Sequence, residues 1–453
     1  MQSQSVLKFF ATMALCFAAC AQACAASEST MKEDYQRTEL PPGVQVIVTE
    51  LEGPVFADAR GKTLYRWPKK DLRNGNAGDV QGKSSCGDTV YHENAGLMSP
   101  YPPGLTLPEV DRRLSCAKTY PPLLAAEAAK PVGKWTIVDR PDGGKQWAYE
   151  GWAVYTSILD KRSGDVFGGS NLDNSVETGA SRVPVGPDAN VPPQFAVHTT
   201  MRGRMITLVE GWSIYTYDKD GRNKSNCKDE ACLDGWVPIL AAAYARPIGE
   251  WTIFERAPGV KQWAFRGAPL YRHETDRKQH AMDGSDLPGW QNVYTQLAPS
   301  PPQEFALKET MIGSVLGDAH GKTLYRYRCT DDAADQQLCD SPEAPQAYRL
   351  AVCGGGDVER CLKAFPYVLA SRDVKSPNQT WTTMNIDPQT GKVAKEGDTK
   401  ALHVWAYRGR PVYTFSGDKK SSDILAHAWG EFNGLRNGYM AMVYRDVFSR
   451  RDE

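Results

Sequence analysis

Short segments rich in β-branched and aromatic residues alternate with turn residues along most of this chain. Residues 44–48 carry three valines and an isoleucine, residues 58–62 are typical of a turn, and residues 63–67 alternate as a strand does. The same order recurs with expected strands at 135–138 and 146–149 around a turn at 141–144. Because isolated hairpins are only marginally stable, these hairpins must pack together. The pattern predicts an all-β, mainly antiparallel fold.

The hydrophobic pattern repeats three times. The string W-A-(Y/F)-x-G-x-x-(V/L)-Y occupies residues 147–155, 263–271 and 405–413. Upstream of each copy, a Pro-Pro step precedes a Tyr-x-aromatic triplet that begins at Tyr65, Tyr215 or Tyr325. A residue present in all three copies is explained more economically by a fold built three times than by a single active site.

The repeats predict three tandem small β domains, each made of two related hairpin halves. The first spans 41–180 with an insertion at 72–115, and a linker rich in Pro and Gly follows at 181–193. The second spans 194–298, and the third spans 301–453 with insertions at 330–352 and 385–400. If function is asymmetric, we expect it in these insertions, because loops on a rigid scaffold usually carry binding groups.

The first 25 residues are typical of an export signal. Lys8 precedes a mostly apolar run at 9–19, and the small residues 23–25 fit ordinary signal cleavage. Residues 17–20 resemble a bacterial lipobox, so a lipid anchor at Cys20 is the alternative; we favour cleavage after Ala25. No later stretch has the length of a membrane span. We therefore expect a periplasmic or envelope location.

The charge and cysteine content narrow the function further. With 53 basic and 54 acidic residues, the chain lacks the positive excess that nucleic acid or an anionic membrane surface favours. Eight cysteines follow the signal, an even number in each repeat, which predicts disulfides in an oxidising compartment. Their spacing is poor for zinc. The expected disulfide pairs are Cys86–Cys116, Cys227–Cys232, Cys329–Cys339 and Cys353–Cys361.

Each half of a repeat places an aspartate shortly after its strand-end tyrosine. Such an aspartate typically caps a turn by accepting backbone N–H bonds, and we favour that role. Alternatively, the two aspartates of one repeat face each other and bind an ion or ligand, or act as a catalytic pair on glycans. The six aspartates are Asp71, Asp160, Asp220, Asp276, Asp331 and Asp418.

The repeated tryptophans Trp147, Trp263 and Trp405 have two interpretations. Each shares one strand face with the aromatic residue two positions later, as residues of a hydrophobic core do. A platform on which sugars stack is the alternative, since large aromatic side chains are also common in binding sites. We favour the core.

The second repeat resembles a known family. Tyr215, Tyr217 and Asp220 form a Y-x-(F/W/Y)-x-x-D motif, followed by Cys227 and Cys232. This motif is similar to that of a secreted-repeat family of predicted bacterial lipoproteins, whose biochemical function is not established. The resemblance extends over nearly the whole chain after the signal. It implies export to a bacterial envelope and brings no catalytic residues with it.

We expect a non-enzymatic envelope protein that presents its repeats to a ligand or partner, either an envelope protein or a glycan. The first alternative is a glycan-acting enzyme that uses an aspartate pair. The second is a metal or redox accessory protein that uses His92, Met98 or His273. The sequence contains no haem-attachment motif, P-loop or dinucleotide fingerprint, so we predict no cofactor.

Overall fold

A computed structural model describes residues 32–68, 78–88, 114–169, 182–274, 276, 278–329, 338–344, 346–430 and 437–446. Antiparallel strands dominate, which confirms the all-β prediction. The signal at 1–25, Asp71, Asp331, His92 and Met98 lie outside the described residues, and so does most of the insertion at 72–115.

Each repeat opens with a hairpin whose turn is closed by a threonine–glycine hydrogen bond, and the turn of the first repeat is one residue longer than the other two. In the first, Thr49 Oγ1 donates to the carbonyl oxygen of Gly53 at 3.0 Å, and Gly53 has a positive φ that favours glycine. The equivalent bonds join Thr200 to Gly203 and Thr310 to Gly313. The hairpin strands are β1 (Gln45–Val48) with β2 (Pro54–Ala57), β9 (Phe195–Thr200) with β10 (Gly203–Leu208), and β19 (Ala306–Thr310) with β20 (Gly313–Gly317).

The tyrosine-bearing strand follows and lies between two partners. The register places Tyr65 opposite Tyr155, so the two motif tyrosines of the first repeat face each other across a strand pair. Tyr215 and Tyr271 pair in the same way in the second repeat, as do Tyr325 and Tyr413 in the third. The central strands are β3 (Tyr65–Arg66), β11 (Tyr215–Tyr217) and β21 (Tyr325–Cys329); one set of partners is β7 (Trp152–Tyr155), β16 (Tyr271–His273) and β24 (Arg410–Tyr413), and the other is β8 (Val183–Pro184), β17 (Trp290–Asn292) and β26 (Asn437–Ala441).

A further hairpin in each repeat carries the repeated tryptophans. These pairs are β5 (Trp135–Asp139) with β6 (Lys145–Tyr149), β13 (Trp251–Ala257) with β14 (Val260–Phe265), and β22 (Trp381–Ile386) with β23 (Leu402–Tyr407). The remaining strands are β4 (Leu124–Ala125), β12 (Trp236–Pro238), β15 (Ala268–Pro269), β18 (Tyr294–Leu297), β25 (Trp429–Gly430) and β27 (Val443–Asp446). The helices are α2 (Cys116–Thr119), α3 (Glu230–Leu233), η3 (Asp283–Asp286), α4 (Ala347–Gly354) and α5 (Val358–Ala364).

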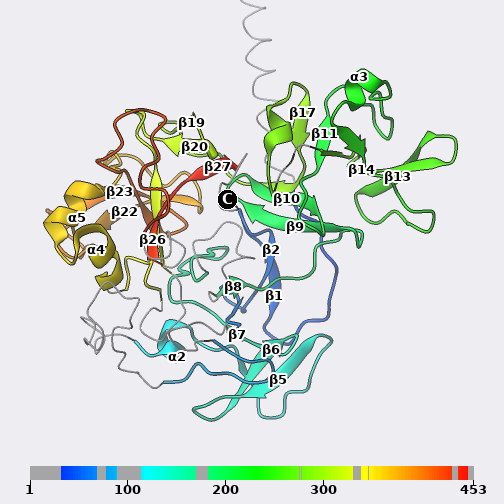
Figure 1. Ribbon diagram of the computed structural model, residues 1–453. Helices are drawn as coiled ribbons and strands as arrows, with labels where there is room; N and C mark the ends of the chain where they lie inside the picture. Colours follow the sequence, from blue (N-terminus) through cyan, green and yellow to red (C-terminus); the bar gives the residue numbers. More distant parts are fainter. Residues whose placement is uncertain are drawn as a thin grey trace, which may run out of the picture.

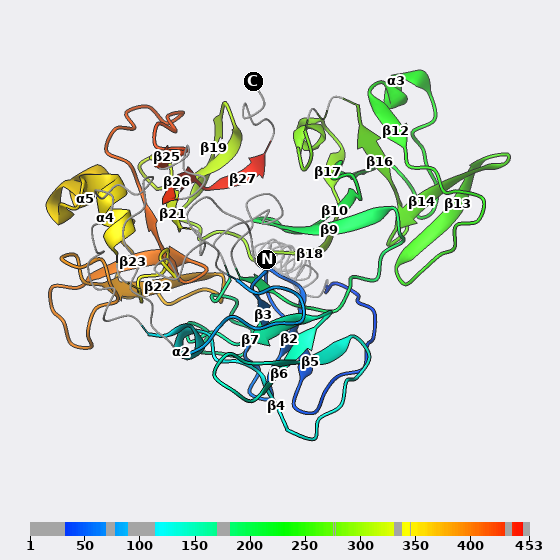
Figure 2. The ribbon, with the colours of Figure 1, turned by 60° about the horizontal axis from the view of Figure 1, so that its bottom comes forward.

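The three repeats occupy separate parts of the molecule, arranged around a common centre (Figures 1 and 2). Among the described residues, every named strand pair joins strands of one repeat, provided that β8 is counted with the first. Because β8 pairs with β3, the segment 181–193 is more than a linker, and the sheet of the first repeat continues past residue 180. The independent folding of each repeat stays a prediction.

The hairpin turn of the first repeat forms the junction between the repeats. Leu51 is buried in one cluster with Met201 of the second repeat and Phe305 of the third. Beside it, the Glu50 carboxylate accepts bonds from the backbone N–H groups of Gln379 and Thr380 at 2.9 and 2.8 Å. Apolar packing and hydrogen bonds therefore both hold the repeats together.

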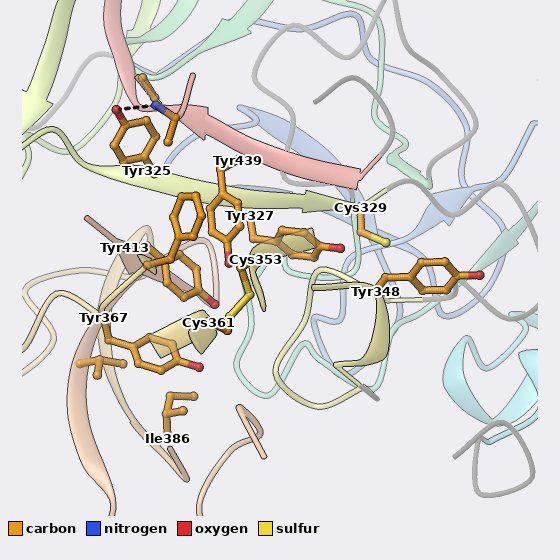
Figure 3. Close-up of a cluster of buried hydrophobic side chains, with 14 of the residues drawn as sticks. Tyr325, Tyr327, Cys329, Tyr348, Cys353, Cys361, Tyr367, Ile386, Tyr413 and Tyr439 are labelled. Carbon is orange, nitrogen blue, oxygen red and sulfur yellow. Dashed lines mark hydrogen bonds between the residues drawn. A yellow bond between two sulfur atoms is a disulfide. The ribbon is translucent and has the colours of Figure 1, made fainter. Parts of the chain in front are cut away.

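The four predicted disulfides are confirmed. In the third repeat, Cys353 and Cys361 join α4 to α5 within a buried cluster that also contains Tyr327, Tyr413 and Tyr439 (Figure 3). Large aromatic side chains thus fill a small β core, and the disulfide fixes two short helices against it.

Candidate functional site

The second-half aspartates hold the first-half tyrosines. Asp160 is fully buried; its Oδ2 accepts the Tyr65 hydroxyl at 2.8 Å, while its Oδ1 accepts the backbone N–H of Phe167 at the same distance. Each such carboxylate therefore joins the two halves of its repeat and also caps a loop, in line with the capping role. The equivalent bonds join Tyr215 to Asp276 at 3.0 Å and Tyr325 to Asp418 at 2.8 Å.

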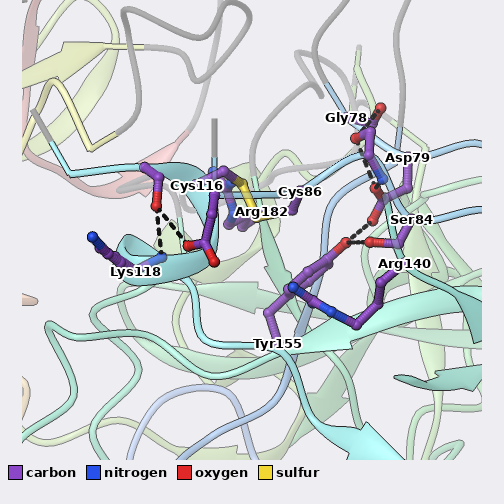
Figure 4. Close-up of a disulfide and its surroundings, with 12 residues drawn as sticks. Gly78, Asp79, Ser84, Cys86, Cys116, Lys118, Arg140, Tyr155 and Arg182 are labelled. Carbon is purple, nitrogen blue, oxygen red and sulfur yellow. Dashed lines mark hydrogen bonds between the residues drawn. A yellow bond between two sulfur atoms is a disulfide. The ribbon is translucent and has the colours of Figure 1, made fainter. Parts of the chain in front are cut away.

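The reciprocal bond is made by a residue that the sequence analysis missed. Tyr155 donates its hydroxyl to Asp79 Oδ2 at 2.8 Å and lies 2.8 Å from the Ser84 hydroxyl (Figure 4). Asp79 stands where Asp71 was expected to act. The shared string D-x-x-x-K-S-x-C at 79–86 and 220–227 is the signal that could have found it. In the second repeat Tyr271 contacts Asp220 at 2.7 Å and Ser225 at 2.8 Å.

These tyrosine–aspartate pairs are electrostatically costly to build. Burial raises the pKa of Asp160 and of Asp276 to about 7, although the tyrosine hydroxyls oppose the shift. Burial also raises the pKa of Tyr65 well above its usual value. Catalysis on a glycan needs two carboxylates beside an accessible bond. Among the described motif aspartates, Asp160, Asp276 and Asp418 bind tyrosines in the interior instead. Asp220 binds Tyr271 at a partly exposed position, so the geometry of all four serves the framework.

The three candidate tryptophans are buried, with 5%, 1% and 2% of Trp147, Trp263 and Trp405 exposed. Trp263 Nε1 donates to Gln194 Oε1 at 3.1 Å, and its ring meets that of Phe195 edge-on with centroids 5.8 Å apart. An exposed sugar-stacking platform therefore does not describe these residues. They belong to the core.

One position beside the disulfide differs between the repeats. In the first, the fully buried Arg182 lies between two rings, 3.8 Å from the Trp67 centroid and 3.4 Å from the Tyr120 centroid. Its guanidinium also donates to Cys116 Sγ at 3.3 Å (Figure 4). In the other two repeats the strand register puts an aromatic side chain at the position of Arg182. Trp290 lies between Tyr217 and Trp236, and Tyr439 lies between Tyr327 and Phe365.

The histidine proposed for a metal or redox role is packed among rings. His273 is 9% exposed, its ring centroid lies 4.4 Å from that of Trp236, and burial lowers its pKa. The described part of the chain contains no group of three or more His, Cys, Asp or Glu side chains that could hold a metal ion. It also contains no helix long and apolar enough to cross a membrane.

A cavity of about 550 Å³ lies between the first two repeats. Its wall is formed by β2, the start of β9 and the segment 184–189. In the other two repeats the corresponding segment is a strand, β18 or β27, paired with the opening hairpin. In the first repeat the opening hairpin has no such partner among the described residues, and β1 and β2 form a two-stranded sheet. The missing strand leaves room for the cavity.

Five charged side chains belong to the described residues of the cavity wall, and four of them have an opposite charge close by. Glu52 lies 2.6 Å from Arg408, and Arg204 lies 2.9 Å from Glu33. Although burial opposes its ionisation, Glu52 has a lowered pKa because of Arg408. Glu150 and Asp188 share Lys134 at 2.7 and 2.8 Å. The fifth is Arg66, whose Nε is buried without a hydrogen-bond partner in the described structure.

The chain matches no protein-family model, no curated protein and no solved structure. The resemblance of its motif to the secreted-repeat family therefore stays an expectation. Two features of the geometry are therefore the candidates for function. One is the repeated tyrosine–aspartate framework, and the other is the cavity between the first two repeats. None of the described residues that line the cavity belongs to the insertions in which asymmetric function was expected.

Proposed function

We propose that the chain is an exported, non-enzymatic protein of the bacterial envelope, whose β repeats form a scaffold that binds a ligand or partner. The observation that carries this proposal is the use of the motif residues. In every repeat a buried tyrosine donates to a buried aspartate of the other half. Because the same residues hold the same bond three times, their repetition is explained by folding, and binding is left to features by which the repeats differ.

Export is supported by the apolar run at 9–19 and by four disulfides, which form and persist in oxidising compartments. Binding is supported by the cavity, whose volume lies in the range of small-molecule sites at roughly 300–1,000 Å³. It is bounded by two repeats, and in the part of the first repeat that the structure describes no third strand pairs with the opening hairpin.

The location is tested by expressing the tagged full chain, and a variant lacking residues 2–25, in a Gram-negative host. After alkylation of free thiols and fractionation, we expect the full chain in the envelope fraction with Cys86, Cys227 and the other bridged cysteines oxidised. The truncated variant is the control and is expected in the cytoplasm with reduced thiols. An intact chain found reduced in the cytoplasm contradicts the proposal.

The absence of catalysis is tested separately with isolated envelope glycans. We expect no sugar release by the purified protein beyond that of a heat-unfolded sample. Asp160→Asn and Asp276→Asn are the variants to compare if release occurs. Release that one of these substitutions abolishes, while circular dichroism stays unchanged, favours the glycan-acting enzyme and contradicts a scaffold.

A further inference from the structure

Two histidines and two methionines come together in the second repeat. His198 on β9 lies directly opposite Met205 on β10, so both side chains project from the same face of the hairpin. The ring of His280 meets that of His198 with centroids 4.4 Å apart. Met282 is buried in one cluster with Met205 and Tyr294. Two imidazole rings and two thioether sulfurs, supplied by the hairpin and by a distant loop, therefore meet at one place.

Three of these four side chains are buried, and the fourth reaches solvent. Met205, Met282 and His280 are 0%, 4% and 8% exposed, whereas His198 is partly exposed. In the part of the chain that the structure describes, His198 Nε2 is buried without a hydrogen-bond partner. His403 in the third repeat shares this property, so the nitrogen of His198 matters only together with the thioether opposite it. A metal ion bound at this nitrogen gives it a partner, and the exposed part of His198 gives the ion access.

The two strand positions carry other residue types in the first and third repeats. One backbone N–H of each opening hairpin donates to the strand or segment beside it, and this aligns the hairpins at Phe56, Ile206 and Leu316. The residue before each of these, with its cross-strand partner, gives the pairs Met205 with His198, Val55 with Ile47, and Val315 with Lys308. The Lys308 ammonium is held by the carbonyl oxygen of Gly321 and by the Thr323 hydroxyl.

The two loop positions differ between the repeats in the same way. A hydroxyl group just before the tyrosine-bearing strand donates to the backbone carbonyl oxygen of Ala281, and the equivalent bonds go to Asp165 and Asp423. The residues on either side are His280 and Met282 in the second repeat, Gly164 and Val166 in the first, and Ser422 and Ile424 in the third. Imidazole and thioether groups therefore fill all four positions in the second repeat and none in the other two.

The backbone of His280 adds an independent observation. Its φ is +62°, and the equivalent Gly164 of the first repeat has a φ of +87°. Residues other than glycine uncommonly adopt this left-handed region, and such outliers concentrate at functional sites. An imidazole at a position where glycine fits without strain points to a function of the ring.

The chemistry of the four side chains selects the ion. Soft thioether ligands favour Cu(I), which imidazole also binds, whereas Mg²⁺ and Ca²⁺ require oxygen ligands. The four ligands are neutral, and Arg204, next to Met205 on β10, is a cation already paired with Glu33. A monovalent ion is therefore less costly to bury here than a divalent one. We propose that His198, Met205, His280 and Met282 form a Cu(I)-binding site in the second repeat.

The test measures Cu(I) binding to the disulfide-bonded full chain after its free thiols have been alkylated. The coloured chelator bicinchoninate competes for the ion without oxygen, with ascorbate as a reductant that leaves disulfides intact. The double variant Met205→Leu, Met282→Leu conserves core volume. We expect it to weaken Cu(I) binding by about tenfold or more, since even the loss of a residue that only supports a metal ligand costs about 10–100-fold. Met311→Leu is the matched control, because Met311 is 58% exposed in the third repeat, and it is expected to change nothing.

A second variant keeps the test decisive if the double methionine variant does not fold. His198→Ile gives the second repeat the residue that Ile47 supplies in the first, and we expect the same loss of Cu(I) affinity. X-ray absorption of the loaded chain is expected to show both sulfur and nitrogen beside the copper. Unchanged Cu(I) affinity in either variant overturns the proposal, as does copper with no sulfur neighbour. Displacement of Cu(I) by an equal concentration of Zn²⁺ also overturns it.

This inference rests on the proposed binding function, but the two fail differently. An exported, oxidised chain that binds no Cu(I) loses the metal site and keeps the envelope scaffold. A chain that is found reduced in the cytoplasm, and whose purified, oxidised form binds Cu(I) through Met205 and Met282, keeps the metal site and loses the proposed location.

Discussion

The first and second repeats share a framework, and two of their differences lie at the opening hairpin and beside the disulfide. Both hold a tyrosine of one half on an aspartate of the other, and both place their motif tyrosines opposite each other. The first has a two-stranded opening hairpin and a buried arginine beside its disulfide, where the second has three strands and Trp290. The hydrogen bonds between a tyrosine of one half and an aspartate of the other, the crossed bonds, are therefore common to the fold. The position between two aromatic rings, in contrast, accepts either a cation, Arg182, or a third ring, Trp290.

The largest expected effect concerns that position between the rings. Trp290→Ala removes a ring stacked 3.6 Å from Trp236, and we expect a loss of about 3–5 kcal/mol in the free energy of unfolding, as for other buried aromatic truncations. Arg182→Ala should cost less, because losing its cation–π contacts is offset by no longer burying a charge. Denaturant unfolding, with hydrogen exchange to locate the affected repeat, measures both.

Arg182→Trp sharpens the same comparison. It gives the first repeat the residue type of the second, between Trp67 and Tyr120, and we expect it to be more stable than Arg182→Ala. If Arg182→Trp is the less stable of the two, the two positions are not equivalent and the comparison fails.

We expect the disulfide of the first repeat to stabilise the fold more than that of the second. Cys86–Cys116 spans 30 residues and Cys227–Cys232 spans 5. The chain-entropy model gives a stabilisation of about 4 kcal/mol for the longer loop and about 2 kcal/mol for the shorter. Replacing each pair by alanine and measuring unfolding tests the order. Equal losses would show that local strain or residual structure, and not loop length, determines the effect.

Acid sensitivity is expected in the second repeat. His198 on β9 contacts the His280 ring with centroids 4.4 Å apart, whereas Ile47 occupies its register position in the first repeat. Burial, with His280 and Arg204 nearby, lowers the pKa of His198 to about 4. Because the unfolded chain binds this proton more readily, stability is lost as the pH falls from about 6.5 to about 4, by at most about 3 kcal/mol.

His198→Gln should therefore flatten the acid side of the stability curve, measured by thermal unfolding between pH 7 and pH 4. Asp160 and Asp276 act in the opposite direction, since their raised pKa values stabilise the fold as the pH falls through 7, so only the difference from the unaltered chain is informative. Replacing the exposed His320 by glutamine is the control and should leave the curve unchanged. An identical curve for His198→Gln contradicts a buried, proton-sensitive pair.

Much of the fold was predictable because its signals are local. Alternation around Tyr65 and the repeat of W-A-(Y/F)-x-G gave the strands, and the even cysteine counts gave the disulfides. The crossed bonds were not foreseen, because a motif read along the chain does not tell which aspartate lies opposite which tyrosine. The spacing from Trp67 favours Asp71, but the aspartate that binds Tyr155 is Asp79, eight positions later. The shared K-S-x-C string identifies Asp79, and its cysteine alone does not.

The cavity could not be predicted from any single repeat. It lies beside the opening hairpin, at the place where β18 pairs with β10 in the second repeat and where the described first repeat has no corresponding strand. Its charge depends on Arg408 and Glu33, which reach Glu52 and Arg204 from distant parts of the chain. Sequence patterns report neighbours along a strand, and this site is built from neighbours across repeats.

The smallest expected effect tests whether the crossed bonds are equivalent in the two repeats. Tyr65→Phe and Asp160→Asn each leave one partner of a buried bond, and their double mutant measures the coupling, which we expect to be about 1–2 kcal/mol. The matched cycle uses Tyr215 and Asp276, where the hydroxyl lies 3.0 Å from both carboxylate oxygens. Because both aspartates have a raised pKa from burial, we expect both couplings to be similar at pH 6. Unfolding of the single and double variants supplies the two values. A coupling near zero in either repeat would mean that its tyrosine–aspartate contact is incidental to packing, and the shared framework would then have to be assigned to the aromatic core alone.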